Sequence, residues 1–216
     1  HDTDSAATLK ALADALGADK AADPTPLRKP DAPTGELNAA AVGASVGRHM
    51  PENAIVSDDG VSNSLPVFLS TMGAEPHDWM MLTGGAIGQG LPLALGASVA
   101  APDRKVIALT GDGAGMYTNQ ALWSMVREGA DVTTIVFVNH TYRILNIELH
   151  RTGAGNPGPT AKDMLAIGEP DIDWVSLAQS MGVEATAATT AEEFDEAFEK
   201  AMKSTGPKLI AAIVPD

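Results

Sequence analysis

Apolar runs alternate with amphipathic segments along most of the chain from Leu37 onward. Five of these runs are continuous rather than alternating: residues 54–57, 105–110, 132–138, 183–187 and 208–214. Continuous apolar strands are typical of a parallel sheet with both faces covered by helices. Helices are predicted over residues 37–50, 62–72, 87–100, 118–129, 173–181 and 191–204. This order predicts an α/β fold, with a doubly wound, mostly parallel sheet and helices on both faces.

The first 35 residues differ in character from the rest. Residues 5–17 have a weak helical pattern, and the stretch AADPTPLRKPDAPTG that follows carries four prolines between Pro24 and Pro33. Such a composition is typical of a linker, or of an arm that lies over a surface. We expect residues 1–35 to be the end of a preceding domain plus a Pro-rich linker, and residues 36–216 to form the main domain.

The composition of the chain argues against several classes of binding partner and chemistry. The chain has 216 residues, a formal net charge of −14 and no cysteine. The acidic balance argues against nucleic acid and anionic membranes as partners. No stretch approaches the roughly 20 uncharged apolar residues of a membrane helix. The lack of cysteine excludes disulfides and thiol nucleophiles, and is compatible with a reducing, cytoplasmic location.

Polar, glycine-rich groups follow three of the predicted strands. They are Ser57-Asp58-Asp59-Gly60, Gly111-Asp112-Gly113 and Asn139-His140-Thr141. Ligands of doubly wound sheets bind at this edge, outside the carboxyl ends of the strands. The Walker phosphate loop is absent, and the dinucleotide fingerprint fails because its third glycine would fall at Met116. These absences disfavour a nucleotide-binding oxidoreductase domain.

Asp112 and Asn139 close consecutive predicted strands, so their side chains are expected to meet above the sheet. A carboxylate and an amide oxygen, completed by carbonyl and phosphate oxygens, suit Mg²⁺. Such an ion would separate Asp112 from an anion bound at the following helix. The alternative is that Asp112 is an ordinary turn residue, with glycines that permit positive φ.

The spacing of these groups resembles that of the thiamine-diphosphate enzymes, whose signature is G-D-G, about two dozen residues, then N-N. Here Gly111-Asp112-Gly113 is followed by 24 residues and then by Val138-Asn139. The stretches NAIVSDDG and TGGAIGQGLPLALGASVAAPDRKVIALTGDG are similar to the diphosphate-binding domain of the acetolactate synthase and benzoylformate decarboxylase group. Val138 departs from the signature at the Asn that does not bind the metal.

The resemblance implies roles for particular residues. The metal ligands would be the Asp112 carboxylate, the Asn139 side-chain oxygen and the Thr141 carbonyl. Backbone N–H groups of Gly113 and Ala114 would hold phosphate at the start of a helix. The remaining implied cofactor contacts are Gly60, Val61 and Ser62 as a second phosphate clamp, Gly85, Ala86 and Ile87 beneath the cofactor rings, and Gly111 and Tyr142. In this scheme the Gly85 carbonyl accepts from the aminopyrimidine amine, and the Ile87 side chain bends the cofactor.

The function implied by the resemblance is that of a thiamine-diphosphate- and Mg²⁺-dependent lyase or transferase acting on 2-oxo acids. Acetolactate-synthase-like carboligation is favoured, and benzoylformate-type decarboxylation and a non-catalytic cofactor-binding module remain as alternatives. Residues placed on the substrate side are Ile144, Leu145 and Glu148. The activating glutamate is expected from a pyrimidine-binding domain that this chain lacks, and FAD would bind only through another missing domain. No certain catalytic residue is therefore assigned, the chain alone is expected to be inactive, and a homodimer or homotetramer is expected.

Overall fold

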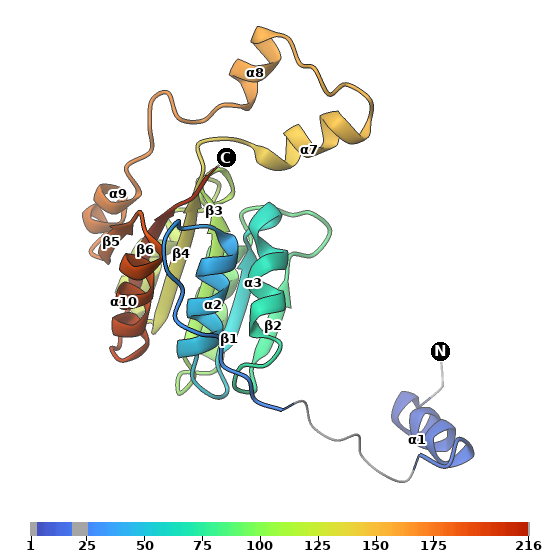
Figure 1. The fold of residues 1–216 in the computed structure, drawn as a ribbon. Coiled ribbons are helices and arrows are strands. Elements are labelled where there is room, and N and C mark those ends of the chain that lie inside the picture. The colour runs from blue at the N-terminus through green and yellow to red at the C-terminus, as the bar shows by residue number, and fades with distance from the viewer. Residues whose placement is uncertain (1–3, 19–25, 216) are drawn as a thin grey trace.

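The computed structural model describes residues 4–18 and 26–215, and its centre is a parallel sheet of six strands. The strands are β1 (Ile55–Asp59), β2 (Asp78–Met81), β3 (Val106–Gly111), β4 (Val132–Val138), β5 (Glu184–Ala188) and β6 (Lys208–Ile213). They lie in the order β2-β1-β3-β4-β6-β5, and every neighbouring pair is parallel (Figure 1). The predicted α/β fold is confirmed.

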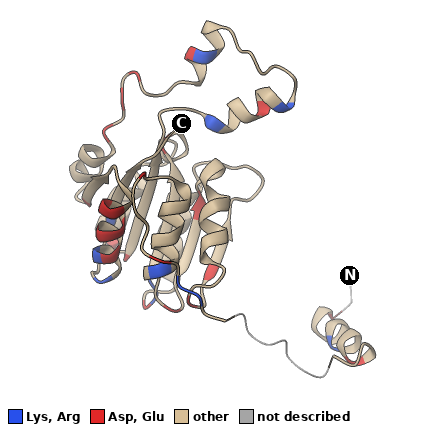
Figure 2. Ribbon diagram, in the orientation of Figure 1, with Lys and Arg blue, Asp and Glu red and all other residues tan. Residues whose placement is uncertain are grey.

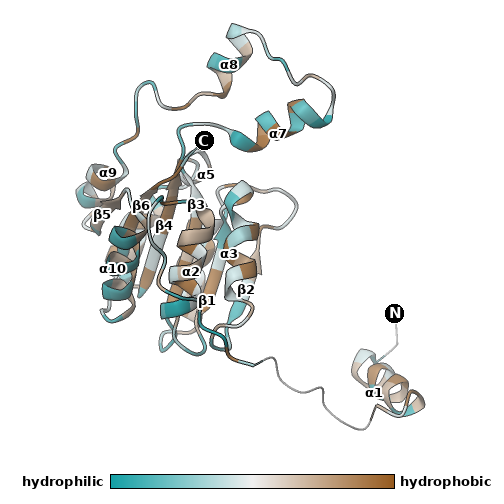
Figure 3. Cartoon of the chain, in the orientation of Figure 1, coloured by the Kyte–Doolittle hydropathy of each residue, from teal (hydrophilic) through white to brown (hydrophobic). Residues whose placement is uncertain are grey.

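Helices cover both faces of this sheet. One face carries α2 (Ala39–His49), α3 (Ser64–Thr71) and α10 (Ala191–Met202), and the other carries α4 (Gly90–Ala100), α6 (Ala121–Glu128) and α9 (Trp174–Ser180). Side chains of β4 alternate between the two cores: Phe137 packs with Phe194, and Val136 packs with Trp174. All seven residues of β4 are buried, which explains its continuous apolar run. The outer surface of α10 is acidic and hydrophilic (Figures 2 and 3).

The carboxyl ends of the strands lead into short elements that surround the predicted site. These are η1 (Val61–Asn63), a 3-10 turn after β1; α5 (Asp112–Gly115), after β3; and α7 (Arg143–Arg151) and α8 (Pro159–Leu165), after β4. Helices α7 and α8 lie beyond the carboxyl edge of the sheet (Figure 1). The N-terminus of α7 packs beside η1, so the chain segments after β1 and β4 meet there.

The N-terminal region contains α1 (Ser5–Ala15), which buries none of its side chains. Residues 26–34 form neither helix nor strand, and lie against the main domain, where Arg28 N–H donates to the Gly73 carbonyl at 2.7 Å. The rest of the predicted linker, residues 19–25, lies outside the described residues, and the division into domains stays a prediction. In the described ranges, no helix has the length and apolar content needed to cross a membrane.

Strand β2 and helix α8 are among the elements that the sequence did not predict. Strand β2 has only four residues at the edge of the sheet, all of them exposed or half-buried, so it lacks a continuous apolar run. Helix α8 has seven residues, none of them buried, and follows a Gly/Pro-rich loop. Both elements are too short and too exposed to produce a periodic pattern of buried positions.

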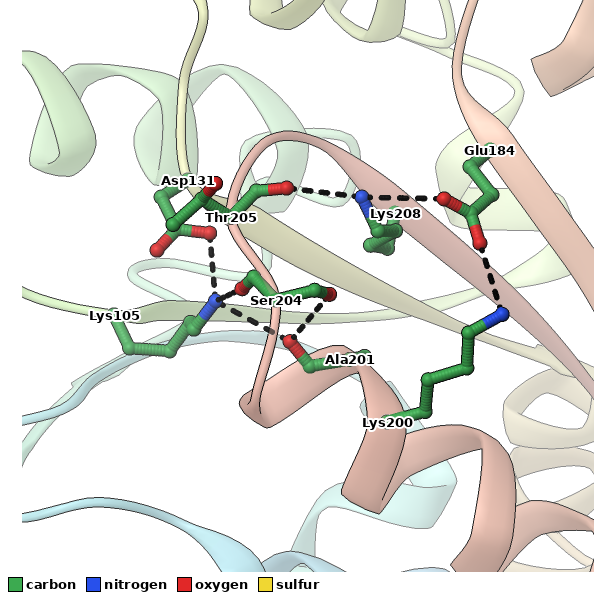
Figure 4. A network of polar contacts seen from close by, with 8 residues as sticks. All are labelled: Lys105, Asp131, Glu184, Lys200, Ala201, Ser204, Thr205 and Lys208. Carbon is green, nitrogen blue, oxygen red and sulfur yellow. Dashed lines mark hydrogen bonds and ion pairs between the residues drawn. The ribbon is translucent and has the colours of Figure 1, made fainter.

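A polar network ties the amino edge of the sheet together (Figure 4). The Lys105 ammonium, with a side chain only 8% exposed, lies 2.6 Å from the Asp131 carboxylate and donates to the Ser204 carbonyl, also at 2.6 Å. A longer bond of 3.3 Å reaches the Ala201 carbonyl at the end of α10. One cation therefore neutralises a carboxylate beside β4 and satisfies carbonyls at a helix C-terminus.

Candidate functional site

Asp112 lies where β3 passes into α5, and it connects the ends of β3 and β4. Its side chain is 4% exposed. One carboxylate oxygen, Oδ2, accepts from the backbone N–H groups of Asn139 at 3.0 Å and His140 at 2.8 Å, while Oδ1 accepts from the N–H of Gly113 at 2.8 Å. The Asp112 carboxylate therefore fixes the position of the loop after β4 relative to the end of β3.

The environment of Asp112 opposes its negative charge. Burial raises the pKa of the Asp112 carboxyl, while the hydrogen bonds from His140, Gly113 and Asn139 and the nearby His140 ring lower the pKa in part. Desolvation is the largest of these effects. A cation beside the carboxylate would reverse this balance by stabilising the ionised form.

The loop after β4 is held in a conformation that directs consecutive N–H groups at Asp112. His140 has φ of 58°, a left-handed conformation that is uncommon for a residue other than glycine, and its ring lies 3.1 Å from the Asp171 carboxylate. The same loop is fixed from the other side, because Thr141 forms a β-bridge with Ala166 and Tyr142 N–H donates to Leu165 at 2.9 Å. The segment before α9 thus supports the loop from outside.

Glycine is required at position 113 for packing. A Cβ atom there would lie 2.6 Å from the Tyr142 ring. The ring of Tyr142 therefore lies directly against the backbone at the start of α5. This contact joins the start of α5 to the loop after β4, two segments that are far apart in the sequence.

Asp59 anchors the loop that precedes α4. It is fully buried at the end of β1, and its Oδ2 accepts from the N–H groups of Gly88 at 2.8 Å and Gly90 at 3.2 Å. Its other oxygen, Oδ1, has no hydrogen-bond partner among the described residues. Burial raises the pKa of Asp59, and the two backbone bonds oppose that rise in part.

The loop that Asp59 anchors has a sharply turned backbone. Gly84, Gly85 and Gly88 all have positive φ, and the Gly85 carbonyl accepts from the Ile87 N–H at 2.9 Å. A carbonyl oxygen has two lone pairs, so Gly85 can accept a further bond. The Ile87 side chain remains 38% exposed.

Most of the predicted cofactor residues surround one cavity of about 60 Å³, which we call the Asp112 cavity. Its predicted lining residues are Val61, Ile87, Gly111, Asp112, Gly113, Ala114, Asn139, Thr141, Tyr142 and Ile144. Sequence reasoning missed Asn63, Phe137 and Arg143, which also line it. The only sequence feature that could have indicated these three residues is their position, because each lies at or just beyond the end of a strand.

Other predicted residues lie apart from the Asp112 cavity. Ser62 lines a neighbouring cavity of about 310 Å³ at the start of α2, which we call the Ser62 cavity. Gly60, Gly85, Ala86, Leu145 and Glu148 line neither cavity. Glu148 is paired with Arg151 at 2.7 Å on α7. Their predicted roles stay predictions.

The donor set suits a hard cation that also binds a ligand. Within the described ranges, no group of three or more His, Cys, Asp or Glu side chains lies close enough to hold a metal by itself. The Asn139 side-chain oxygen accepts only a long bond of 3.4 Å, from the Thr141 N–H, and is therefore available as a ligand. Asp112, Asn139 and Thr141 fit Mg²⁺ provided that the bound anion and water supply the remaining oxygens.

Comparison with known proteins agrees with this geometry. The family model described as "Thiamine pyrophosphate enzyme, C-terminal TPP binding domain" matches residues 69–212. The chain is 49% identical over 210 residues to the protein named "Putative acetolactate synthase large subunit IlvX" of Mycobacterium tuberculosis. The matched region covers 96% of this chain and 40% of that relative. It is 31% identical over 210 residues to benzoylformate decarboxylase of Pseudomonas aeruginosa, covering 96% and 38%.

The fold is also similar to that of a solved enzyme. The thiamine diphosphate-dependent 4-hydroxybenzoylformate decarboxylase of Rhodococcus jostii RHA1 superposes with a TM-score of 0.77 at 30% identity, over 97% of this chain and 39% of that one. The chain thus spans about 40% of the length of the curated relatives it matches.

Proposed function

Since the chain belongs to the thiamine pyrophosphate enzyme family and matches its C-terminal cofactor-binding domain, we propose that it forms the diphosphate-binding part of an acetolactate-synthase-like enzyme acting on 2-oxo acids. The observation that carries this proposal is the position of the buried Asp112 carboxylate, hydrogen-bonded to the loop that contains Asn139 and Thr141. When bound, the cofactor supplies the electron sink for cleaving and forming bonds beside a carbonyl.

In this proposal the chain contributes position and charge. Asp112, Asn139 and Thr141 hold Mg²⁺, which offsets the repulsion between the Asp112 carboxylate and the diphosphate. The backbone of Gly113 and Ala114 lines the cavity where the phosphates would lie, with Gly113 N–H donating to Asp112 Oδ1, and Val61 lines it from the β1 side. Ile87 would pack beside the cofactor rings, and Ile144 would face the substrate.

The small volume of the Asp112 cavity supports the proposal that a second domain completes this site. Small-molecule sites usually enclose about 300–1,000 Å³, whereas the Asp112 cavity holds only about 60 Å³. That volume suits an ion with a few waters and leaves the rest of the cofactor uncovered. We therefore propose that a pyrimidine-binding domain covers the cofactor and brings the activating glutamate, with residues 1–35 leading from a preceding domain, in a homodimer or homotetramer.

Ligand-induced stabilisation tests this proposal. Thiamine diphosphate with Mg²⁺ at about ten times its dissociation constant would add about 1.4 kcal/mol of stability, or a rise of about 3–6 °C in Tm. EDTA should abolish the rise. Asp112→Asn, which retains a hydrogen-bond acceptor but removes the charge, should fold and lose the rise, whereas Asp131→Asn at the opposite edge of the sheet should keep it. A rise with NAD and none with thiamine diphosphate would refute the assignment.

Benzoylformate-type decarboxylation is a second candidate reaction, supported by the 31% identity to benzoylformate decarboxylase over nearly the whole chain. The two candidates predict different products once the chain is joined to a pyrimidine-binding domain. Carboligation converts two molecules of pyruvate to acetolactate and CO₂, whereas decarboxylation converts benzoylformate to benzaldehyde and CO₂. Product analysis with each substrate distinguishes them, and turnover of neither supports a non-catalytic cofactor-binding module.

A further inference from the structure

We propose that Arg143, together with Asn63, binds the terminal phosphate of the ligand at the Asp112 cavity. This inference rests on the proposed function, and adds to it two residues that the sequence signature does not contain. Arg143 is the first residue of α7, and Asn63 is the last residue of η1. The two come from segments that follow different strands and meet because α7 packs beside η1.

Arg143 and Asn63 are the residues shared by the two neighbouring cavities. Both line the Asp112 cavity, beside Asp112 and Gly113, and both line the Ser62 cavity, beside Ser62. The proposed metal ligands lie on one side of them and the predicted second phosphate clamp lies on the other. A phosphate that extends from the metal toward Ser62 must therefore pass Arg143 and Asn63.

Neither side chain forms a hydrogen bond or ion pair with other described residues. Asn63 is 4% exposed as a residue, and its side chain makes no capping hydrogen bond to α3. Its amide atoms are not among the fully buried unpartnered atoms of the described residues, so they remain accessible from the cavities that Asn63 lines and can bind a ligand there. Arg143 is half-buried and has no ion-pair or hydrogen-bond partner among the described residues, although the chain is strongly acidic.

Charge at the cavity favours the same assignment. Arg143 is the only Lys or Arg among the residues that line the Asp112 cavity, and Asp112 is the only carboxylate there. A terminal phosphate carries roughly 1.5 to 2 negative charges near neutral pH. One divalent cation cannot neutralise both the Asp112 carboxylate and a diphosphate, so a guanidinium at the phosphate end reduces the remaining repulsion. The start of α7 is blue in Figure 2 and lies beyond the carboxyl edge of the sheet.

Calorimetric titration of the chain in Mg²⁺ tests the inference, with thiamine diphosphate, thiamine monophosphate and pyruvate as separate probes. Arg143→Ala should weaken thiamine diphosphate binding roughly ten- to a hundredfold, the usual effect of losing a hydrogen bond to a charged group. The loss should be smaller for thiamine monophosphate, which lacks the terminal phosphate. Arg143→Lys should restore part of the affinity by retaining the charge without the fork of donors.

Two further variants separate binding from folding. Asn63→Ala should also weaken thiamine diphosphate binding, with a smaller effect because the amide is neutral. Arg151→Ala, at the far end of the same helix and 71% exposed, is the matched control and should bind as the unmodified chain does. The Tm without ligand should be unchanged for Arg143→Ala, which excludes a folding defect.

The outcomes of the titration are distinct. If the unmodified chain binds no thiamine diphosphate, both the proposed function and this inference fail. If the unmodified chain binds and Arg143→Ala binds equally well, only the inference fails. A loss confined to pyruvate binding would place a substrate carboxylate at Arg143 and would also overturn the phosphate assignment.

Discussion

Asp59 places a carboxylate in the core. One of its oxygens accepts from Gly88 and Gly90 in the segment between β2 and α4, which we call the cofactor loop because it contains the predicted cofactor residues Gly85, Ala86 and Ile87. The other oxygen has no partner among the described residues. Burial raises its pKa in the folded state above the ordinary 3.8, so the folded protein holds this proton more tightly than the unfolded chain does. Its stabilising contribution is complete in acid and is lost as the pH rises through the folded pKa. We expect Asp59→Asn to gain Tm relative to the unmodified protein as pH is raised from 4 to 7, measured by calorimetry across that range.

Asp58, the neighbouring buried carboxylate, provides the control for the Asp59→Asn prediction. Both of its oxygens are used, by Gly60 N–H, the Ser64 hydroxyl and the Trp79 indole. Asp58→Asn replaces one accepting oxygen by a donor, and should cost about 1–3 kcal/mol. A Tm difference between Asp59→Asn and the unmodified protein that did not vary with pH would contradict the prediction for Asp59.

Sequence alone was informative about residues that end predicted strands or belong to the signature. It predicted that Asp112 and Asn139 would come together, because both end consecutive strands and parallel strands end at one edge. It could not assign Asp59 to the cofactor loop, because the partners Gly88 and Gly90 lie about 30 residues away and any of several carboxylates could have faced them. Arg143 was missed for the same reason, since the packing of α7 beside η1 has no local sequence pattern.

At the scale of elements, Lys105 joins β3 to the loop before β4 and to the end of α10 (Figure 4). We expect Lys105→Met to lower the free energy of unfolding by about 2–3 kcal/mol, because a partly buried carboxylate and two carbonyls lose a charged donor. Lys200→Met is the control, because the pair between Lys200 and Glu184 is exposed and should contribute less than about 1 kcal/mol. Urea unfolding of both variants measures the difference, and equal losses would contradict it.

The elements that sequence predicted well are the ones with buried, continuous strands. The boundaries of β4 were predicted residue for residue, because both of its faces are covered and every side chain is apolar or a buried threonine. The edge strand β2 was missed because its two end residues are exposed, its two middle residues are only half-buried, and four residues give no periodicity. Helix α4 began three residues later than predicted, since Gly88 has a left-handed backbone and the loop bonds to Asp59 instead of continuing the helix.

At the scale of the whole molecule, apolar side chains remain exposed around the β2 edge of the sheet. They include Leu65 and Leu69 on α3, Met72 just after it, Met81 on β2, and Leu93 and Val99 on α4. Helix α4 carries no charged residue, and its Val99 is 64% exposed in this chain. Exposed apolar surface of this kind marks a site of association. We predict that the chain self-associates, with an apparent mass in sedimentation equilibrium that rises with concentration.

Charged substitutions test whether this surface is the cause. Leu69→Glu with Val99→Glu should make the chain monomeric and leave its Tm within a few degrees, because neither side chain is in the core. Met164→Glu on α8 is the control, since that side chain is 74% exposed but lies away from the β2 edge, and should leave the association unchanged. Association that persisted in the double variant would show that another surface joins the copies. The pyrimidine-binding domain proposed to cover the cofactor would then have to approach the Asp112 cavity from another side of the molecule, since the cofactor loop connects β2 to α4.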